Sequence, residues 1–156
     1  MPVVRKPLDL SRVTPVDLAY AAGIIDGEGC LTIVKQSYKR AGYPDNYWVR
    51  AEVGTVDDRI CPWLYETFGG ALNRKTVVWK GVPRLTYRWS VSHAQLSDFL
   101  VAVRPYLKLK GDIANALLEC YATRTVPGKN ITDEVREQRR LLSEHVKSLR
   151  VKRRVA

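Results

Sequence analysis

Alternating apolar and polar residues predict two pairs of β-strands in this chain. The segments 30–39 and 47–55 are rich in β-branched and aromatic residues, and a loop rich in turn-forming residues separates them. The segments 71–80 and 84–92 repeat this arrangement around a turn at 81–83. We therefore expect two β-hairpins.

Apolar residues spaced three and four apart predict helices between and after the hairpins. The first helix precedes the first hairpin: Thr14 can cap it, Pro15 suits its first position, and Asp17 is placed for a capping box. The other expected helices cover about 57–68, 93–103, 112–123 and 132–149. Four strands with helices segregated to one face predict an α+β fold.

The length of 156 residues suits one domain with a core of its own. We expect a single domain over 1–156, with a core at about 15–123, a C-terminal helix at about 132–149 and a loose basic tail at 150–156. No apolar run approaches the roughly 18 residues of a membrane span, and the N-terminus lacks the apolar stretch of a signal peptide. We expect no membrane partner.

The three cysteines are too scattered for a zinc site or a disulfide framework. Cys30, Cys61 and Cys120 are odd in number and far apart in the chain. We interpret them as reduced packing residues of an intracellular protein. Whether the compartment is an organelle, a phage-infected cell or the cytoplasm is left open.

Positive charge narrows the class of partner. The chain has 26 Lys and Arg against 16 Asp and Glu, a net charge of +10. Such an excess favours a polyanion, most simply nucleic acid. A membrane surface is the alternative, but the basic residues are spread along the chain among β-branched and aromatic ones.

One face of the expected sheet is polar enough to enter a DNA major groove. There Arg and Lys read guanine, Gln and Asn read adenine, and Thr or Val contact thymine methyl groups. The alternative is an ordinary solvated sheet face. The residues that we expect to face DNA are Thr32, Val34, Gln36, Tyr38, Arg40, Asn46, Trp48, Arg50, Glu52, Arg74, Thr76, Arg84, Thr86 and Arg88.

The end of the first helix combines acidic and small residues. Asp26 and Glu28 lie where the helix dipole is negative, which is unfavourable unless a cation is bound nearby. Small side chains would also let two copies of the helix touch closely and bring two Glu28 carboxylates together around a divalent metal. The residues that we place at this interface are Ala19, Ala22, Gly23 and Asp26. The alternative is a buried helix with a glycine cap.

Residues 21–29, AAGIIDGEG, resemble the motif that names the LAGLIDADG homing endonucleases. The residues identical to the motif are Ala22, Gly23, Ile25, Asp26 and Gly29. The helix–hairpin–helix–hairpin order matches the repeat of that family, and the segments 66–70, 87–91 and 105–110 are similar to parts of its members. The resemblance covers about residues 15 to 123.

This resemblance implies a fold, an activity and an assembly. The fold would be α-β-β-α-β-β-α, with a four-stranded antiparallel saddle-shaped sheet, helices on one face and extra C-terminal helices. The activity would be site-specific cleavage of double-stranded DNA in intron homing. Because only one motif occurs in the chain, the enzyme would be a homodimer with a long pseudo-palindromic target.

The resemblance also implies roles for individual residues. Glu28 would bind the metal together with the Gly27 carbonyl, and Lys110 would orient water and offset phosphate charge. Thr55 takes the place of a longer polar residue in the water network, and Arg59 would supply a second basic group. Mg²⁺ would be the metal, Mn²⁺ would substitute for it, and Ca²⁺ would bind without supporting cleavage.

Two other classes of function remain open. The same scaffold serves two kinds of nucleic-acid binder that do not cleave, namely intron RNA maturases and transcription regulators. A maturase would have intron RNA as a partner. Regulators of this kind tend to lose the acid that is present here as Glu28. The third class is a basic interaction domain without a specific site.

Overall fold

The computed structural model describes residues 2–40, 42–124 and 131–155, the last three by their backbone alone. In chain order the elements are β1 (Val4–Lys6), α1 (Pro15–Glu28), β2 (Gly29–Gln36), β3 (Asn46–Thr55), α2 (Ile60–Phe68), β4 (Gly70–Trp79), β5 (Val82–Ser92), α3 (His93–Val103), η1 (Arg104–Tyr106), α4 (Gly111–Ala122) and α5 (Asp133–Val155). Apart from β1, the strands, α1 and α2 follow the predicted order.

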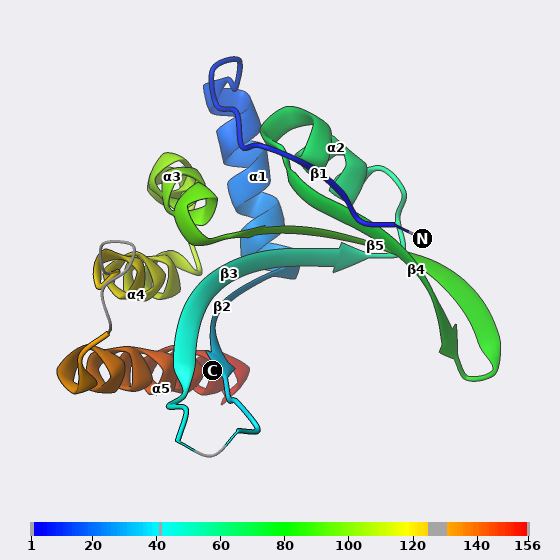
Figure 1. The fold of residues 1–156 in the computed structure, drawn as a ribbon. Helices are drawn as coiled ribbons and strands as arrows, with labels where there is room; N and C mark the ends of the chain where they lie inside the picture. The colour runs from blue at the N-terminus through cyan, green and yellow to red at the C-terminus, as the bar shows by residue number, and fades with distance from the viewer. Residues whose placement is uncertain (1, 41, 125–130, 156) are drawn as a thin grey trace.

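Helix α1 begins at the predicted cap. The Asp17 backbone N–H donates to Thr14 Oγ1 at 3.2 Å, and the Thr14 backbone N–H donates to Asp17 Oδ2 at 3.0 Å. This reciprocal pair satisfies two N–H groups that the first turn would otherwise leave without partners. The helix runs to Glu28 and passes directly into β2, so its last turn lies at the start of the edge strand (Figure 1).

The sheet has five antiparallel strands in the order β1-β4-β5-β3-β2, one more than predicted. The additional strand is β1, whose three residues pair with β4, Val4 opposite Leu72. The N-terminal segment then passes close to Gly69, where an added Cβ would lie 2.1 Å from the Pro7 carbonyl oxygen. Three paired residues are too few to give an alternating pattern, which is why the sequence did not indicate this strand.

The helices lie against one face of the curved sheet and leave its concave face uncovered (Figure 1). Large apolar side chains from both layers form the core, with Trp89, Phe68 and Phe99 fully buried. The aromatic rings of Phe68 and Trp89 meet Phe99 edge to face, at centroid distances of 5.3 and 5.2 Å. The α+β class with helices on one face of the sheet is confirmed.

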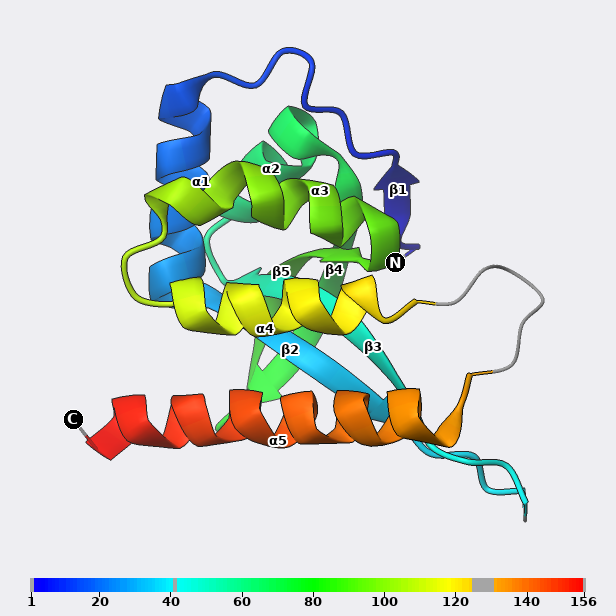
Figure 2. The same ribbon diagram turned by 90° about the vertical axis from the view of Figure 1, so that its left-hand side faces the viewer.

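The C-terminal helix is longer than predicted. Helix α5 continues to Val155, so the backbone of 150–155 is helical and the expected loose tail is wrong for these residues. Figure 2 shows α5 antiparallel to α4 and across β2 and β3. Leu142 and Val146 are buried, and the Arg150 guanidinium donates to the Leu31 carbonyl. None of the helices described is long and apolar enough to cross a membrane.

Candidate active site and nucleic-acid interface

The C-terminal end of α1 is joined to the segment before α4 through Asp26. Its Oδ2 accepts the backbone N–H groups of Lys108 and Leu109 at 2.7 and 3.2 Å, and its Oδ1 accepts that of Lys110 at 2.9 Å. An ionised carboxylate is a strong acceptor for several N–H groups at once. The Asp26 carboxylate therefore holds the end of α1 to the segment before α4.

Lys110 makes the reverse connection to the same turn. Its Nζ donates to the carbonyl oxygens of Ile25 and Gly29 at 2.7 and 2.6 Å. The last carbonyls of a helix lack partners within it and carry partial negative charge, so an ammonium group is well placed there. The Lys110 ammonium group therefore lies against the turn that contains Gly27 and Glu28.

Glu28 is the exposed acid of this turn. Its carboxylate forms no hydrogen bond or ion pair with any described residue, and Gly27 beside it is exposed as well. A carboxylate and helix-end carbonyls are oxygen ligands, which suit Mg²⁺ and Ca²⁺. Within the described chain, however, no group of three His, Cys, Asp or Glu side chains comes together. The turn thus offers part of a cation site.

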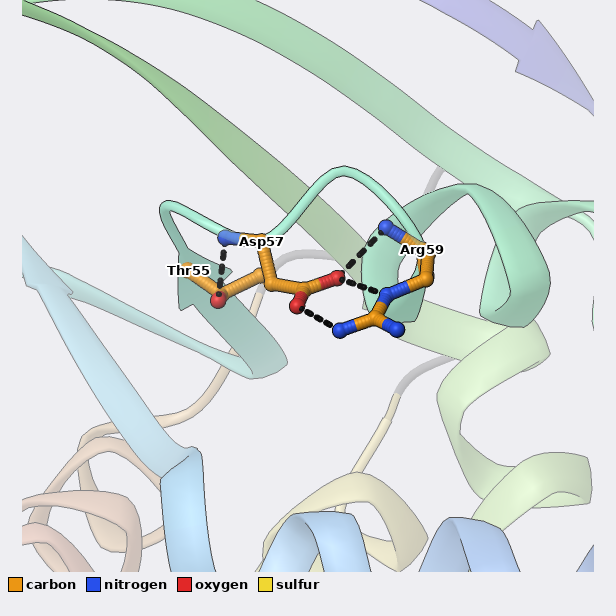
Figure 3. Close-up of polar contacts among 3 residues, drawn as sticks. All are labelled: Thr55, Asp57 and Arg59. Carbon is orange, nitrogen blue, oxygen red and sulfur yellow. Dashed lines mark hydrogen bonds and ion pairs between the residues drawn. The ribbon is translucent and has the colours of Figure 1, made fainter.

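Thr55 and Arg59 belong to a separate cluster at the end of β3 (Figure 3). Asp57 connects them: its backbone N–H donates to Thr55 Oγ1 at 3.0 Å, and its carboxylate accepts Nε and Nη2 of Arg59 at 3.0 and 2.6 Å. This pairing lowers the pKa of Asp57 to about 2 and raises that of Arg59. Glu28 forms no hydrogen bond or ion pair with this cluster in the described chain.

We call the concave face of the sheet the open face. Strand register identifies its residues, because directly opposite residues on paired strands point to the same side. The predicted residues of β2 and β3 share this face: Thr32 lies opposite Arg50, Val34 opposite Trp48, and Gln36 opposite Asn46. Tyr38 and Arg40 lie beyond the end of β2, in the following loop.

The arginines of the open face are held by an acid. Glu52 lies between Arg50 and Arg88, with N···O distances of 3.6 and 3.4 Å. The Arg50 guanidinium carbon is 5.6 Å from the Trp48 ring centroid. The Nε of Arg50 is buried and has no hydrogen-bond partner among the described residues. A buried N–H without a partner is costly, so this face has an unsatisfied donor on a residue predicted to meet DNA.

The prediction for β4 was wrong by one residue in register. Arg74 pairs with Tyr87 and Thr76 with Leu85, so both lie on the face of the buried Leu72–Trp89 pair, opposite to Thr86 and Arg88. The open-face residues of β4 that were missed are Asn73, Lys75, Val77 and Trp79. Counting alternate positions from Leu72, the first large apolar residue of the strand, would have found them.

His93 makes a contact with this surface that the sequence did not indicate. Its ring stacks on Trp48, with centroids 5.4 Å apart and an interplanar angle of 24°. The backbone of His93 has φ +56°, which is unusual for a residue other than glycine and places it at the corner between β5 and α3. Neither the conformation nor the contact has a signal in the sequence.

The predicted interface on α1 is only partly available to a second copy. Ala22 is 0% exposed within its own chain, so its assignment to the interface was wrong. Asp26 is half-buried, with its carboxylate engaged as described above. Ala19 and Gly23 are exposed, and Tyr20, at helical spacing from Gly23, extends the same apolar side.

The sequence matches no model of a protein family, and no curated protein resembles it in sequence. The fold is shared with solved homing endonucleases. The structure of I-CvuI with the I-CreI target has a TM-score of 0.70 and 20% identity, over 86% of this chain and 82% of that chain. The archaeal intron-encoded I-Vdi141I in complex with DNA has a TM-score of 0.68 and 13% identity, over 86% and 84%.

A third solved structure is a longer protein. The LAGLIDADG homing endonuclease I-SmaMI bound to cleaved DNA has a TM-score of 0.62 and 15% identity, over 88% of this chain but only 46% of that chain. This chain therefore corresponds to about half of I-SmaMI. These likenesses support the resemblance seen in residues 21–29, and the chain has the fold of the LAGLIDADG homing endonucleases.

Proposed function

We propose that this chain is a site-specific, metal-dependent DNA endonuclease that cuts both strands of a pseudo-palindromic target as a homodimer. The observation that carries the proposal is the exposed Glu28 carboxylate, without a partner in the described chain, at the junction of α1 and the polar sheet. A structural acid would be paired, as Asp26 is. An exposed acid at the negative end of a helix is favourable only when a cation joins it.

The donor set of this turn suits Mg²⁺, with Mn²⁺ as a substitute and Ca²⁺ as an ion that binds without cleavage. Mg²⁺ is commonly held by one or two carboxylates together with phosphate oxygens and water, so one Glu28 from each chain plus the DNA would complete the site. The metal would supply an activated water and neutralise charge on the phosphodiester oxygens. Glu28 and the Gly27 carbonyl would hold it, and Lys110 would support the turn and place positive charge beside the phosphate.

The exposed side of α1 supports a homodimer. Gly23 and Gly27 are exposed, and an added Cβ would contact nothing within 4 Å at either position. The fold of one chain therefore does not require these glycines, whereas a closely packed second helix would. Two copies would also match the size relation to I-SmaMI, of which one copy covers 46%.

The open face supports DNA as the substrate. It presents Arg50, Arg84 and Arg88 with amide and hydroxyl side chains between them, in a chain of net charge +10. Because the unsatisfied Nε of Arg50 is buried, the guanidinium would turn outward to reach a base or phosphate acceptor. A strand pair of this polarity fits the major groove, as other β-sheet readers do.

The test is cleavage of a randomised duplex library with Mg²⁺ by the wild type and by Glu28→Gln. We expect selective double-strand cuts by the wild type and their loss in Glu28→Gln, with DNA binding retained. Glu119→Gln is the matched control, because Glu119 is exposed on α4, away from this turn, and should keep full activity. Enrichment of a sequence without cutting, even with Mn²⁺, would refute the catalytic proposal and favour a non-cleaving DNA binder or an RNA maturase.

A further inference from the structure

A cavity of about 160 Å³ lies beside the start of β3, where α4 and α5 pack against the sheet. Strand β3 pairs with β5 only from Arg50 onward, so its first residues have a free edge here. Figures 1 and 2 show this part of β3 at the end of the sheet far from α1, so the cavity is separate from the turn that contains Glu28. The polar and aromatic residues that line it include Asn46, Trp48, His93, Tyr121, Arg124 and Arg139.

Arg139 of α5 is a buried charge in the wall of this cavity, with only 8% of its surface exposed. Its Nε and Nη2 donate to the hydroxyl and carbonyl oxygens of Thr123 at 2.7 and 3.2 Å, and its Nη1 donates to Asn46 Oδ1 at 3.4 Å. All three acceptors are neutral. Because a guanidinium has five N–H groups, two of those of Arg139 have no acceptor within the described chain.

No Asp or Glu of this chain neutralises Arg139. None of the ion pairs among the described residues includes it, and outside those residues the chain has no Asp or Glu. Burial raises the pKa of the Cys120 thiol, which lines the same cavity, to about 11, so this thiol is neutral near pH 7. The end of α4 offsets only about half a charge, and Arg124 adds a second positive charge there. Arginine is rarely buried without an anionic partner, so these surroundings favour binding of an anion.

Size and donor geometry identify the anion. A cavity of about 150 Å³ can hold benzene, so this one has room for a smaller phosphate group but not for a whole nucleotide. The planar donor fork of a guanidinium matches phosphate oxygens. Arg124 lies on the exposed side of the cavity, with its guanidinium carbon 4.7 Å from the Tyr121 ring centroid. Two arginines can bind different oxygens of one phosphate, whereas a carboxylate offers only two oxygens in one plane.

We propose that this cavity binds a single phosphate group between Arg139 and Arg124. The site goes beyond the proposed cleavage centre, since it uses neither the metal nor Glu28. The phosphate has two possible sources. One is an inorganic phosphate ion, and the other is the DNA backbone, because Asn46 and Trp48 belong to the open face and also line the cavity. The second source rests on the proposed function, and it would place the contact in the outer part of each half-site.

The first experiment measures the melting temperature of the full chain with inorganic phosphate, at constant pH and with ionic strength held constant by chloride. Phosphate at ten times its Kd should raise the melting temperature of the wild type by about 4 °C. The rise should be lost in Arg124→Gln and in Arg139→Lys, which keeps the charge but not the planar fork. Arg140→Gln is the control with the same change in charge as Arg124→Gln, because Arg140 is exposed on α5 and pairs with Glu137. It should leave the rise unchanged.

The second experiment identifies the source, by replacing single phosphates of a target duplex with uncharged methylphosphonate. If the DNA backbone supplies the phosphate, one outer replacement in each half-site should weaken wild-type binding about ten-fold and have little effect on binding by Arg124→Gln. Unmodified duplex should then abolish the effect of free phosphate. If the free ion is the source, no replacement should depend on Arg124, and the effect of free phosphate should persist when duplex is bound.

Two results would overturn the inference. One is an equal melting temperature of the wild type in phosphate and in chloride, together with no position in the duplex that depends on Arg124. The other is an equal rise in all three variants, because this would reflect screening of the net charge. Glu28→Gln should lose cleavage but keep the phosphate effect, so failure of the proposed function and failure of this inference are distinguishable.

Discussion

Asp26 and Lys110 form two opposite connections between α1 and the segment before α4. The carboxylate accepts three backbone N–H groups, and the ammonium group donates to two backbone carbonyls on either side of Glu28. Each charge binds backbone groups of the opposite segment. The position of Glu28 is therefore set by residues 81 or more positions apart in the chain, and not by α1 alone.

Replacing Lys110 by methionine tests this connection. The variant keeps a similar length but leaves the Ile25 and Gly29 carbonyls without that donor, so we expect the free energy of unfolding to fall by roughly 1–3 kcal/mol. Denaturant titration measures the loss. Lys108→Met is the control, because the Lys108 side chain is exposed and only its backbone N–H binds Asp26. Equal stability of the two variants would contradict a structural role for Lys110.

Cys30 offers a chemical probe of the open face. It is exposed and lies opposite Glu52, so the prediction that all three cysteines are packing residues was wrong for Cys30. Cys61 and Cys120 are buried. Burial raises the pKa of both buried thiols, that of Cys120 to about 11, which disfavours the reactive thiolate. We expect a thiol reagent to label the native chain once, at Cys30, and bound DNA to slow that reaction. Cys30→Ser should abolish the labelling; reaction at either buried thiol without denaturant would contradict the structure.

At the scale of elements, α1 has a side with no function within its own chain. Gly23→Leu should raise the free energy of unfolding of the single chain by about 0.5–1 kcal/mol, because leucine favours a helix and a Cβ added at this position has no atom within 4 Å. The same side chain would separate two α1 helices in a dimer. Sedimentation should therefore show a two-chain mass for the wild type and a one-chain mass for the variant. Ala122→Leu, at the exposed end of α4, should keep the two-chain mass.

The connection between β3 and α2 depends on pH through Asp57. Its pKa is lowered from 3.8 to about 2, so its ion pair contributes stability above about pH 4 that is lost as pH falls towards 2. Asp57→Asn should melt a few degrees below the wild type at pH 7, and the two melting temperatures should converge by pH 2. Asp58→Asn, at an exposed neighbour, should follow the wild type throughout. A constant difference between Asp57→Asn and the wild type across this range would refute the ion pair.

Elements whose signals are local could be predicted from the sequence, and those that depend on distant contacts could not. Thr14, Pro15 and Asp17 mark the start of α1 because capping involves neighbours only. Strand β1 could not be predicted, because its three residues form a strand only by pairing with the distant β4. In the candidate site, the family resemblance singled out Asp26 and Lys110, whereas the Asp57 carboxylate, which holds Arg59, lies in none of the segments that carry the resemblance.

At the scale of the whole molecule, the helices and the open face have separate tasks. The helices, α5 included, bury one side of the sheet and fix its curvature, so Leu142 and Val146 belong to the same core as Trp89. The other side keeps its polar and basic residues, in a chain with 26 basic and 16 acidic residues. An antiparallel sheet tolerates such an uncovered side, which leaves it available to a large polyanion.

Two copies joined rigidly through α1 should read the spacing of their half-sites as well as their sequence. Inserting one base pair at the centre of the selected target rotates the half-sites by about 34° and separates them by about 3.4 Å. Two open faces fixed by close helix packing cannot follow this change, so binding should weaken at least about ten-fold and double-strand cleavage should be lost.

The Gly23→Leu variant separates this geometric effect from simple loss of affinity. As single chains, its copies should bind each half-site weakly but with equal affinity at both spacings, measured by titration of labelled duplexes. A duplex with one half-site should bind one wild-type chain and stay uncut on at least one strand. If the wild type bound both spacings equally, the two copies would act independently, and the close packing of α1 that places two Glu28 carboxylates together would be refuted.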